Sequence, residues 1–224
     1  MLKNISNLGD AALYCDFGAE VNKQINSEVI KYFNTIKEKN IEGINNLTPS
    51  YNKLIISYDL RITNFKEIRD KIEKLDIGES LKTKNKKLEI PVCCDTSFSL
   101  DIKRLEKKLS LNKDEILENF FKQEFFCYMT GFIAGMPFLG DLDEKMRAQR
   151  LETPRVKVPK GSVGMTEQFA NIYTFESPGG WNIIGNTPID VFESSKEKEP
   201  NLINPGDTVK FKQISLEEYK NYNE

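Results

Sequence analysis

The residue types best suited to binding a small ligand gather in and just before one segment, VPKGSVGMTEQFANIYTFESPGGWNIIGNTP, at positions 158–188. It holds five of the thirteen glycines and the single tryptophan of the chain. The candidate groups are hydroxyls, glycine N–H groups and one guanidinium: Ser162, Ser177, Thr187, Gly179, Gly180 and Arg155. A guanidinium suits a carboxylate or a phosphate. The set predicts a site for a small anionic ligand, with two alternatives open: Arg155 makes a salt bridge or a stacking contact, and the hydroxyls cap turns.

The glycines of this segment do not form a standard nucleotide-binding motif. No Lys-Ser or Lys-Thr pair follows a Gly-x4-Gly frame, and no Gly-x-Gly-x-x-Gly follows an expected strand. We therefore interpret GSVG and SPGGW as tight turns, which either reverse the chain or present backbone N–H groups to a ligand or partner.

The chain contains no histidine, which excludes histidine-based triads, histidine metal sites and histidine acid-base catalysis. Proton transfer would have to use carboxylates, lysine, tyrosine or a group from a partner. Two of the four cysteines are adjacent, an arrangement that suits neither a disulfide framework nor a zinc site. We expect buried, reduced thiols and no metal site.

Charge does not indicate a particular partner. Lysine and arginine number 32 against 34 acidic residues, a net charge of −2, so we expect neither nucleic acid nor a membrane as partner. The chain has no 18-residue apolar stretch and no basic start followed by a long apolar run. We expect a soluble, cytoplasmic protein.

Residues 1–88 alternate between apolar runs and amphipathic segments. The patterns predict a strand over 11–18, a helix over 21–40, a hairpin over 44–60, a helix over 65–75 and a strand within 82–94. This order of elements predicts a ferredoxin-like α+β domain. The lysine-rich connector that opens the last of these segments marks the expected domain boundary.

Residues 89–224 begin with two helical stretches, the second opened by Asn112 with Glu115 three residues on, the spacing of a capping box. Beyond Phe125, short apolar pieces are separated by Gly, Pro, Asn and Asp. That texture is typical of an antiparallel sheet that closes into a barrel or a sandwich.

Several spaced motifs resemble one family along nearly the whole chain: GDAALYCDFG, PSYNKLIISYD, IPVCCD, YMTGFIAGMPFLG, TPRVKVPKGSVG, IYTFESPGGWNIIGNTPIDVF and NPGDTVKF. They are similar to the KipI/PxpB family, the B subunits of 5-oxoprolinase, formerly described as allophanate hydrolase subunit 1 and related to urea carboxylases. The resemblance implies a ferredoxin-like domain over 1–88 and a cyclophilin-like β-barrel domain, with its leading helices, over 89–224.

The same resemblance implies partners and a reaction. Family members act beside a KipA/PxpC-like C subunit and a PxpA-like A subunit in the ATP-dependent opening of 5-oxoproline, a lactam, to glutamate. ATP would then belong to the complex, and this chain alone would be inactive. Two alternatives stay open: a regulatory protein that inhibits a sensor histidine kinase, and a part of a biotin-dependent carboxyltransferase of the urea carboxylase type.

The chain departs from the family pattern at several polar positions. Phe120 stands where the family usually has histidine, and Asn186 stands where it has arginine. Phe169, Ala170 and Asn171 replace Gln-Thr-Gly. These changes remove groups that would hold a polar ligand. They leave open whether this chain still takes part in catalysis or only binds a partner.

An apolar group near these glycines is a candidate partner interface: Phe132, Met136, Phe138 and Trp181. Core packing is the alternative for each of them.

Overall fold

The computed structural model describes residues 2–78, 85–196 and 198–222. The chain divides into two compact units, Met1–Lys84 and Asn85–Glu224. Part of the lysine-rich connector, residues 82–84, lies outside the described residues. Each unit has its own hydrophobic core.

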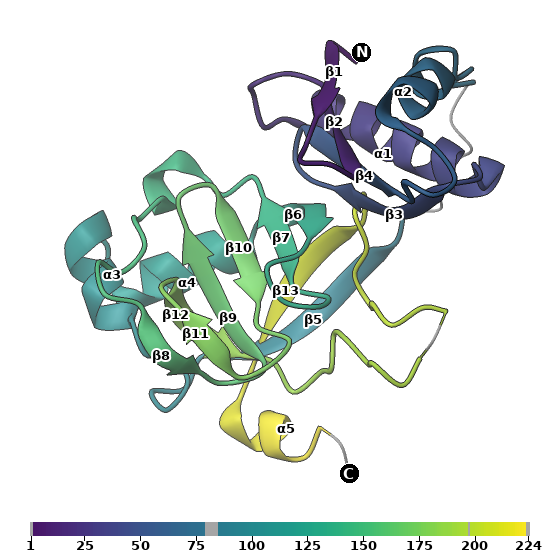
Figure 1. Ribbon diagram of the computed structural model, residues 1–224. Helices are drawn as coiled ribbons and strands as arrows, with labels where there is room; N and C mark the ends of the chain where they lie inside the picture. Colours follow the sequence, from purple (N-terminus) through teal and green to yellow (C-terminus); the bar gives the residue numbers. More distant parts are fainter. Residues whose placement is uncertain (1, 79–84, 197, 223–224) are drawn as a thin grey trace. The chain divides into compact units, whose positions relative to one another are not determined.

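The first unit is a four-stranded antiparallel sheet of order β1-β2-β4-β3 with two helices (Figure 1). Its elements are β1 (Asn4–Asn7), β2 (Ala12–Asp16), α1 (Lys23–Lys39), β3 (Ile44–Pro49), β4 (Lys53–Tyr58) and α2 (Phe65–Glu73). Both helices begin where an asparagine side chain accepts a backbone N–H, Asn22 for α1 and Asn64 for α2. Alternate residues of β2 and β4 pack with residues of both helices in one core, so the helices cover one face of the sheet.

The strand expected to complete this sheet lies elsewhere. The expectation that the strand within 82–94 belongs to the N-terminal sheet is wrong, because β5 (Lys87–Cys93) is a barrel strand. The edge position beside β2 is taken by β1, which the alternation of apolar residues does not reveal. The final residues of β5 are all buried, and its partner β13 lies more than a hundred residues away in the sequence.

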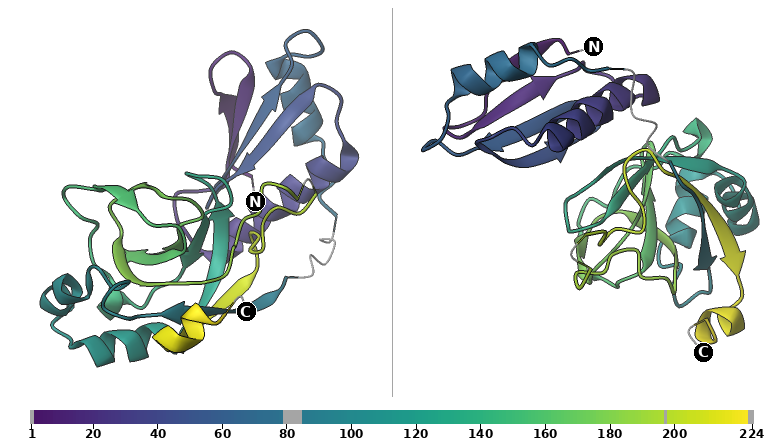
Figure 2. Two further views of the ribbon diagram at one scale, coloured as in Figure 1. Left: turned by 90° about the horizontal axis from the view of Figure 1, so that it is seen from below. Right: turned by 90° about the vertical axis from the view of Figure 1, so that its right-hand side faces the viewer.

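The second unit is built on a closed seven-stranded barrel of order β10-β7-β6-β13-β5-β12-β9, which confirms the predicted barrel. Its other elements are α3 (Ile102–Leu109), α4 (Lys113–Phe121), β6 (Glu124–Thr130), β7 (Pro137–Gly140), a short 3-10 helix (Glu144–Met146), β8 (Arg155–Val158), β9 (Ser162–Thr166), β10 (Phe169–Ile172), β11 (Ser177–Gly179), β12 (Asn182–Asn186), β13 (Thr208–Ile214) and α5 (Leu216–Lys220). Figure 2 shows from two further sides that α5, in yellow, continues from the end of β13.

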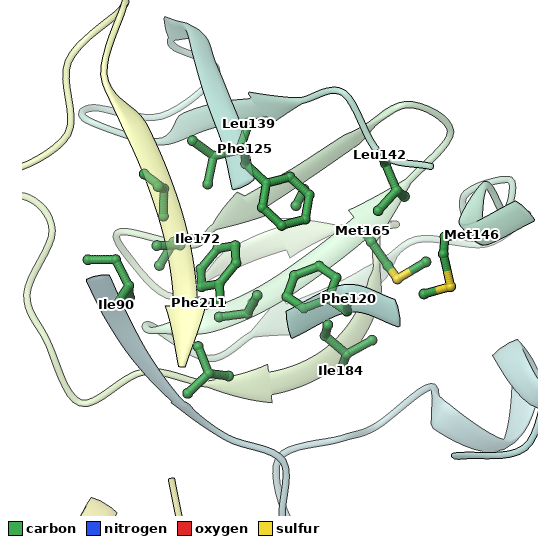
Figure 3. Close-up of a cluster of buried hydrophobic side chains, with 14 of the residues drawn as sticks. Ile90, Phe120, Phe125, Leu139, Leu142, Met146, Met165, Ile172, Ile184 and Phe211 are labelled. Atoms are coloured by element: carbon green, nitrogen blue, oxygen red, sulfur yellow. The ribbon is translucent and has the colours of Figure 1, made fainter. Parts of the chain in front are cut away.

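The barrel interior is filled by apolar side chains from the strands and from the two leading helices. Asn112 and Glu115 form the predicted capping box of α4. Phe120, at the end of α4, is fully buried and stacks on Phe211 with ring centroids 5.1 Å apart. Figure 3 shows these rings together with Phe125 among the aliphatic side chains of the core. The leading helices are therefore part of the barrel's core.

Only Gly161 of the segment GSVG lies in a turn, with a φ of +80° and the N–H of Ser162 donating to the Pro159 carbonyl at 3.2 Å. Residues 162–166 form β9, a fully buried strand that pairs with both β10 and β12. SPGGW contributes β11, which pairs with β8 as a two-stranded ribbon outside the barrel sheet. The glycine-rich region therefore supplies strands more than loops.

Candidate functional site

Arg155 opens β8 and forms an ion pair with a residue that the sequence did not single out. Its Nη2 donates to Oδ1 of Asp101 at 2.6 Å, and 5% of the Asp101 side chain is exposed. Oδ2 of Asp101 accepts the backbone N–H of Ile183 at 2.7 Å. Asp101 precedes α3, yet its side chain does not cap that helix. The carboxylate instead holds the guanidinium of Arg155 against the barrel.

The other terminal nitrogen of this guanidinium makes no hydrogen bond to any described residue. This atom, Nη1 of Arg155, is also buried. An unpaired charged donor in a buried place is costly, and a native structure usually supplies it with a partner. The salt-bridge interpretation of Arg155 is thus confirmed for Nη2, and anion binding at Nη1 stays a prediction.

Asn171, in β10, and Tyr173 lie outside the barrel core, to which their neighbours Ala170 and Ile172 belong, and both side chains are buried. Nδ2 of Asn171 donates to Sδ of Met136 at 3.9 Å, and Met136 packs with Tyr173 in one small core. Asn171 pairs with Gly164 of β9, and a Cβ on Gly164 would approach Asn171 Oδ1 to 2.7 Å. Glycine at 164 thus makes room for the amide. Oδ1 itself is buried and accepts no hydrogen bond from any described residue.

The β8–β11 ribbon approaches Tyr173 at Ser177 and Gly179. Gly179 pairs with Arg155, and Ser177 pairs with Val158. The pairing of the two strands shifts register between Ser177 and Gly179, so the ribbon is irregular at this point. A Cβ on Gly179 would lie 2.1 Å from the Tyr173 hydroxyl oxygen. Ser177 Oγ is buried and, within the described part of the chain, unpartnered.

We call this group the Tyr173 cluster and define it by five residues: Asp101, Arg155, Asn171, Tyr173 and Ser177. It contains three buried hydrogen-bonding atoms without a partner in the described structure: one cationic donor, one hydroxyl and one amide oxygen. Such a set can bind an anionic group at the guanidinium and accept a hydrogen bond at the amide.

Burial raises the pKa of Tyr173, and the hydrogen bonds from Asn171 and Trp181 offset part of this rise. The positive charges of Arg150 and Arg155 also lower it. The phenol is therefore protonated near neutral pH and acts as a fixed hydrogen-bonding group.

The other predicted ligand-binding residues lie outside the cluster. Thr187 Oγ1 accepts the N–H of Ile189 at 3.3 Å, and the Thr187 N–H donates to Gly161 at 2.9 Å, as in a capped turn. The Gly180 carbonyl accepts the N–H of Leu151 at 2.6 Å. Ser162 is buried in β9, where its backbone pairs with Tyr173.

The four apolar residues predicted as a partner interface differ in exposure. Phe132 is 73% exposed and has a φ of +70°, a conformation rare for an aromatic residue. Met136 is buried in a small core with Tyr173. Phe138 and Trp181 are half-buried and make a T-shaped ring contact at 5.6 Å beside the Tyr173 cluster.

The positions that depart from the family pattern are also distinct in structure. Phe120 and Ala170 are buried in the barrel core. Phe169 is buried outside that core and makes T-shaped ring contacts with Tyr128 and Phe138. Asn186 donates to the Lys160 carbonyl and accepts from the Tyr219 hydroxyl, a structural role. Only Asn171 lies in the Tyr173 cluster.

Two further predictions concern cofactors and thiols. Cys15, Cys93, Cys94 and Cys127 are free and buried, as predicted. The described residues contain no group of three or more acidic or cysteine side chains arranged to hold a metal ion. None of the described helices is long and apolar enough to cross a membrane. The glycine-rich strands β9 and β11 do not lead into a helix N-terminus, so they do not form a phosphate loop.

Sequence reasoning missed Asp101, Asn171 and Tyr173 as members of the site. Asp101 looks like a helix cap, and Asn171 looks like a lost family position. Their meeting depends on the pairing of β9, β10 and β12, which joins residues far apart in the sequence. The one available signal is a tyrosine two residues after an asparagine in a strand, which places both side chains on one face.

Comparison with known proteins gives consistent matches. The family model "Carboxyltransferase domain, subdomain C and D" matches residues 3–203. The 5-oxoprolinase B subunit of Bacillus subtilis is 32% identical, over 98% of this chain and 96% of that protein.

Two solved structures show the same fold. The crystal structure of TTHA0988 superposes with a TM-score of 0.82 at 26% identity, covering 92% of this chain and 40% of that one. The Kluyveromyces lactis urea carboxylase gives 0.79 at 18% identity, covering 96% and 22%, and this likeness concerns the fold alone. The matched motifs, the family model and the curated relative agree. The chain belongs to the carboxyltransferase subdomain C and D family, in the branch of the 5-oxoprolinase B subunits that its motifs indicate.

Proposed function

We propose that this protein is the B subunit of an ATP-dependent 5-oxoprolinase, which converts 5-oxoproline, ATP and water to glutamate, ADP and phosphate. The observation that carries the proposal is the 32% identity to a 5-oxoprolinase B subunit over nearly the full length of both chains. The Tyr173 cluster supports it, because it retains unpaired groups suited to a small polar anion.

The proposal assigns ATP to the complex and leaves open which subunit binds it. The glycine-rich segment forms β9 and β11, and neither strand positions backbone N–H groups as a phosphate loop does. The relatives are named as subunits, and we propose a C subunit and an A subunit as the other members of the complex. This chain alone has no activity.

Reconstitution tests the proposal. The chain is co-purified with its C and A subunits, and glutamate release from 5-oxoproline is measured with ATP, without ATP and with each subunit omitted in turn. We expect glutamate only with ATP and all three chains. Equal turnover when this chain is omitted contradicts the proposal.

The same preparation separates the alternatives. A regulatory protein would inhibit the autophosphorylation of a histidine kinase and leave 5-oxoproline turnover unchanged. A carboxyltransferase part would need a biotinylated partner and bicarbonate. Either result, together with a stable but inactive three-subunit complex, replaces the present proposal.

A further inference from the structure

We propose that the Tyr173 cluster binds 5-oxoproline directly, with Arg155 Nη1 and Ser177 Oγ on its carboxylate and Asn171 Oδ1 accepting its lactam N–H. This inference rests on the proposed function for the identity of the ligand. It adds which groups of this chain recognise which parts of that ligand.

The positively charged end of the site is built from arginine, which is much rarer than lysine in this chain. Only six of the 32 basic residues are arginine, and three of these, Arg104, Arg150 and Arg155, lie near the cluster. Arg104 donates to the backbone carbonyl of Arg150, whose charge acts on Tyr173 together with that of Arg155. Asp101 occupies one nitrogen of Arg155 and leaves the other for a second carboxylate. A planar guanidinium has several N–H donors in a fixed arrangement, so it can bind two carboxylates at once.

The negative end of the site selects a ligand that also donates a hydrogen bond. Asn171 Oδ1 is an acceptor, so an inorganic anion at Arg155 would leave it unpaired. Nδ2 of the same amide donates to Met136 Sδ at 3.9 Å, which fixes the direction of Oδ1. A ligand that satisfies the whole cluster carries a carboxylate and an N–H close together. A lactam carboxylate has both on adjacent atoms.

The ribbon provides the approach to these buried atoms. Strands β8 and β11 pair with each other and, within the described residues, with no barrel strand. Arg155 is 27% exposed at its side chain, and Asn171 is fully buried. The ligand therefore meets Arg155 first, and Asn171 lies at the buried end of the cluster.

Trp181 allows binding to be measured without turnover. It is the chain's single tryptophan, and it packs against the small core that contains Tyr173. The purified chain, and separately its complex with the C subunit, is titrated with three ligands while tryptophan fluorescence is recorded. The ligands are 5-oxoproline, 2-pyrrolidinone, which lacks the carboxylate, and 5-oxotetrahydrofuran-2-carboxylate, in which oxygen replaces the lactam N–H.

We expect 5-oxoproline to bind at least about 10-fold more tightly than either analogue, because each analogue loses a hydrogen bond to a buried group. Amide exchange in residues 155–158 and 177–179 should slow when 5-oxoproline binds. Equal affinity for all three ligands overturns the proposal, as does phosphate or ATP competing for the site more strongly than the lactam.

Two variants assign the roles in a crossed design. Arg155→Lys keeps the charge but removes the fork, so it should lose discrimination against 2-pyrrolidinone and keep it against the lactone. Asn171→Leu removes the acceptor, so it should lose discrimination against the lactone and keep it against 2-pyrrolidinone. Arg69→Lys, the same change at an exposed ion pair in the first unit, is the control and should bind as wild type.

Folding of each variant is checked by thermal unfolding, and Ser177→Ala is a milder second test of the carboxylate site. If folded Arg155→Lys and Asn171→Leu bind all three ligands as wild type does, the assignment fails. If they lose discrimination as predicted but the reconstituted complex shows no turnover, the site stands and the proposed function falls. If turnover depends on this chain and neither variant alters affinity, the function stands and the site falls.

Discussion

Phe120 is an apolar core residue at a position where the family usually has histidine. The family resemblance places histidine here, yet the phenylalanine ring is fully buried between Phe125 and Phe211. This position lies inside the barrel core, whereas no residue of the Tyr173 cluster belongs to that core. Loss of the histidine therefore does not remove a group from that cluster.

Restoring a polar residue at 120 should destabilise the protein. Phe120→Ala should lower the free energy of unfolding by about 3–5 kcal/mol, because it removes a buried ring and leaves a cavity. Phe120→His should also destabilise it, since the imidazole would enter an apolar core. Urea denaturation measures both. A Phe120→His protein as stable as wild type would show that the core holds a polar partner for the ring.

At the scale of elements, the β8–β11 ribbon depends on a close approach to Tyr173. Gly179→Ala should destabilise the protein by about 1–3 kcal/mol, because the added methyl group meets the tyrosine hydroxyl and the ribbon must move. Gly78→Ala is the control, since a Cβ there meets nothing within 4 Å. Thermal unfolding and amide exchange of residues 155–158 report both effects. Equal stability of the two variants would contradict the described contact.

The elements that sequence predicts well are those fixed by near neighbours. Helices α1, α2 and α4 begin at asparagine caps whose hydrogen bonds span three residues. Strand β9 resembles a turn in sequence because its glycines match turn chemistry, while its burial depends on β10 and β12. Strand β5 is assigned by its sequence to the wrong sheet, because its partner β13 follows 121 positions later in register. Arg155 is predictable as a site residue, but its partner Asp101 is 54 residues away.

At the scale of the whole molecule, we propose that the two units fold independently. Their cores share no residue. A fragment of residues 85–224 should give a dispersed amide spectrum that matches the corresponding signals of the full chain. A fragment of residues 89–224 should be less stable, because it lacks Lys87 and Leu88, which pair with Thr208 and Val209. Equal stability of these fragments would contradict the role of β5, and an unfolded longer fragment would contradict independent folding.

The buried thiols predict how stability depends on pH. Burial raises the pKa of Cys15 and of Cys94 to about 12, from an ordinary value near 9. The unfolded state therefore loses these protons first as pH rises. The free energy of unfolding should not depend on these thiols below pH 9. Between about pH 9 and 12 it should fall, by at most about 1.4 kcal/mol per pH unit for each thiol.

Urea denaturation across this pH range measures the fall, with Cys15→Ala as the comparison. Ellman's reagent should react with no thiol of the native protein at pH 8 and with all four after denaturation. Rapid reaction of the native protein, or stability that does not change above pH 9, would contradict the described burial.

In the assembled enzyme, this chain should supply the group that binds the substrate carboxylate of a 5-oxoprolinase. The most direct test is the KM for 5-oxoproline of the reconstituted complex carrying Arg155→Lys. We predict a KM raised by about 10-fold or more, because a charge-assisted hydrogen bond to the substrate is lost, with the complex still assembled. An assembled, active complex whose KM equals that of wild type would contradict this role for Arg155.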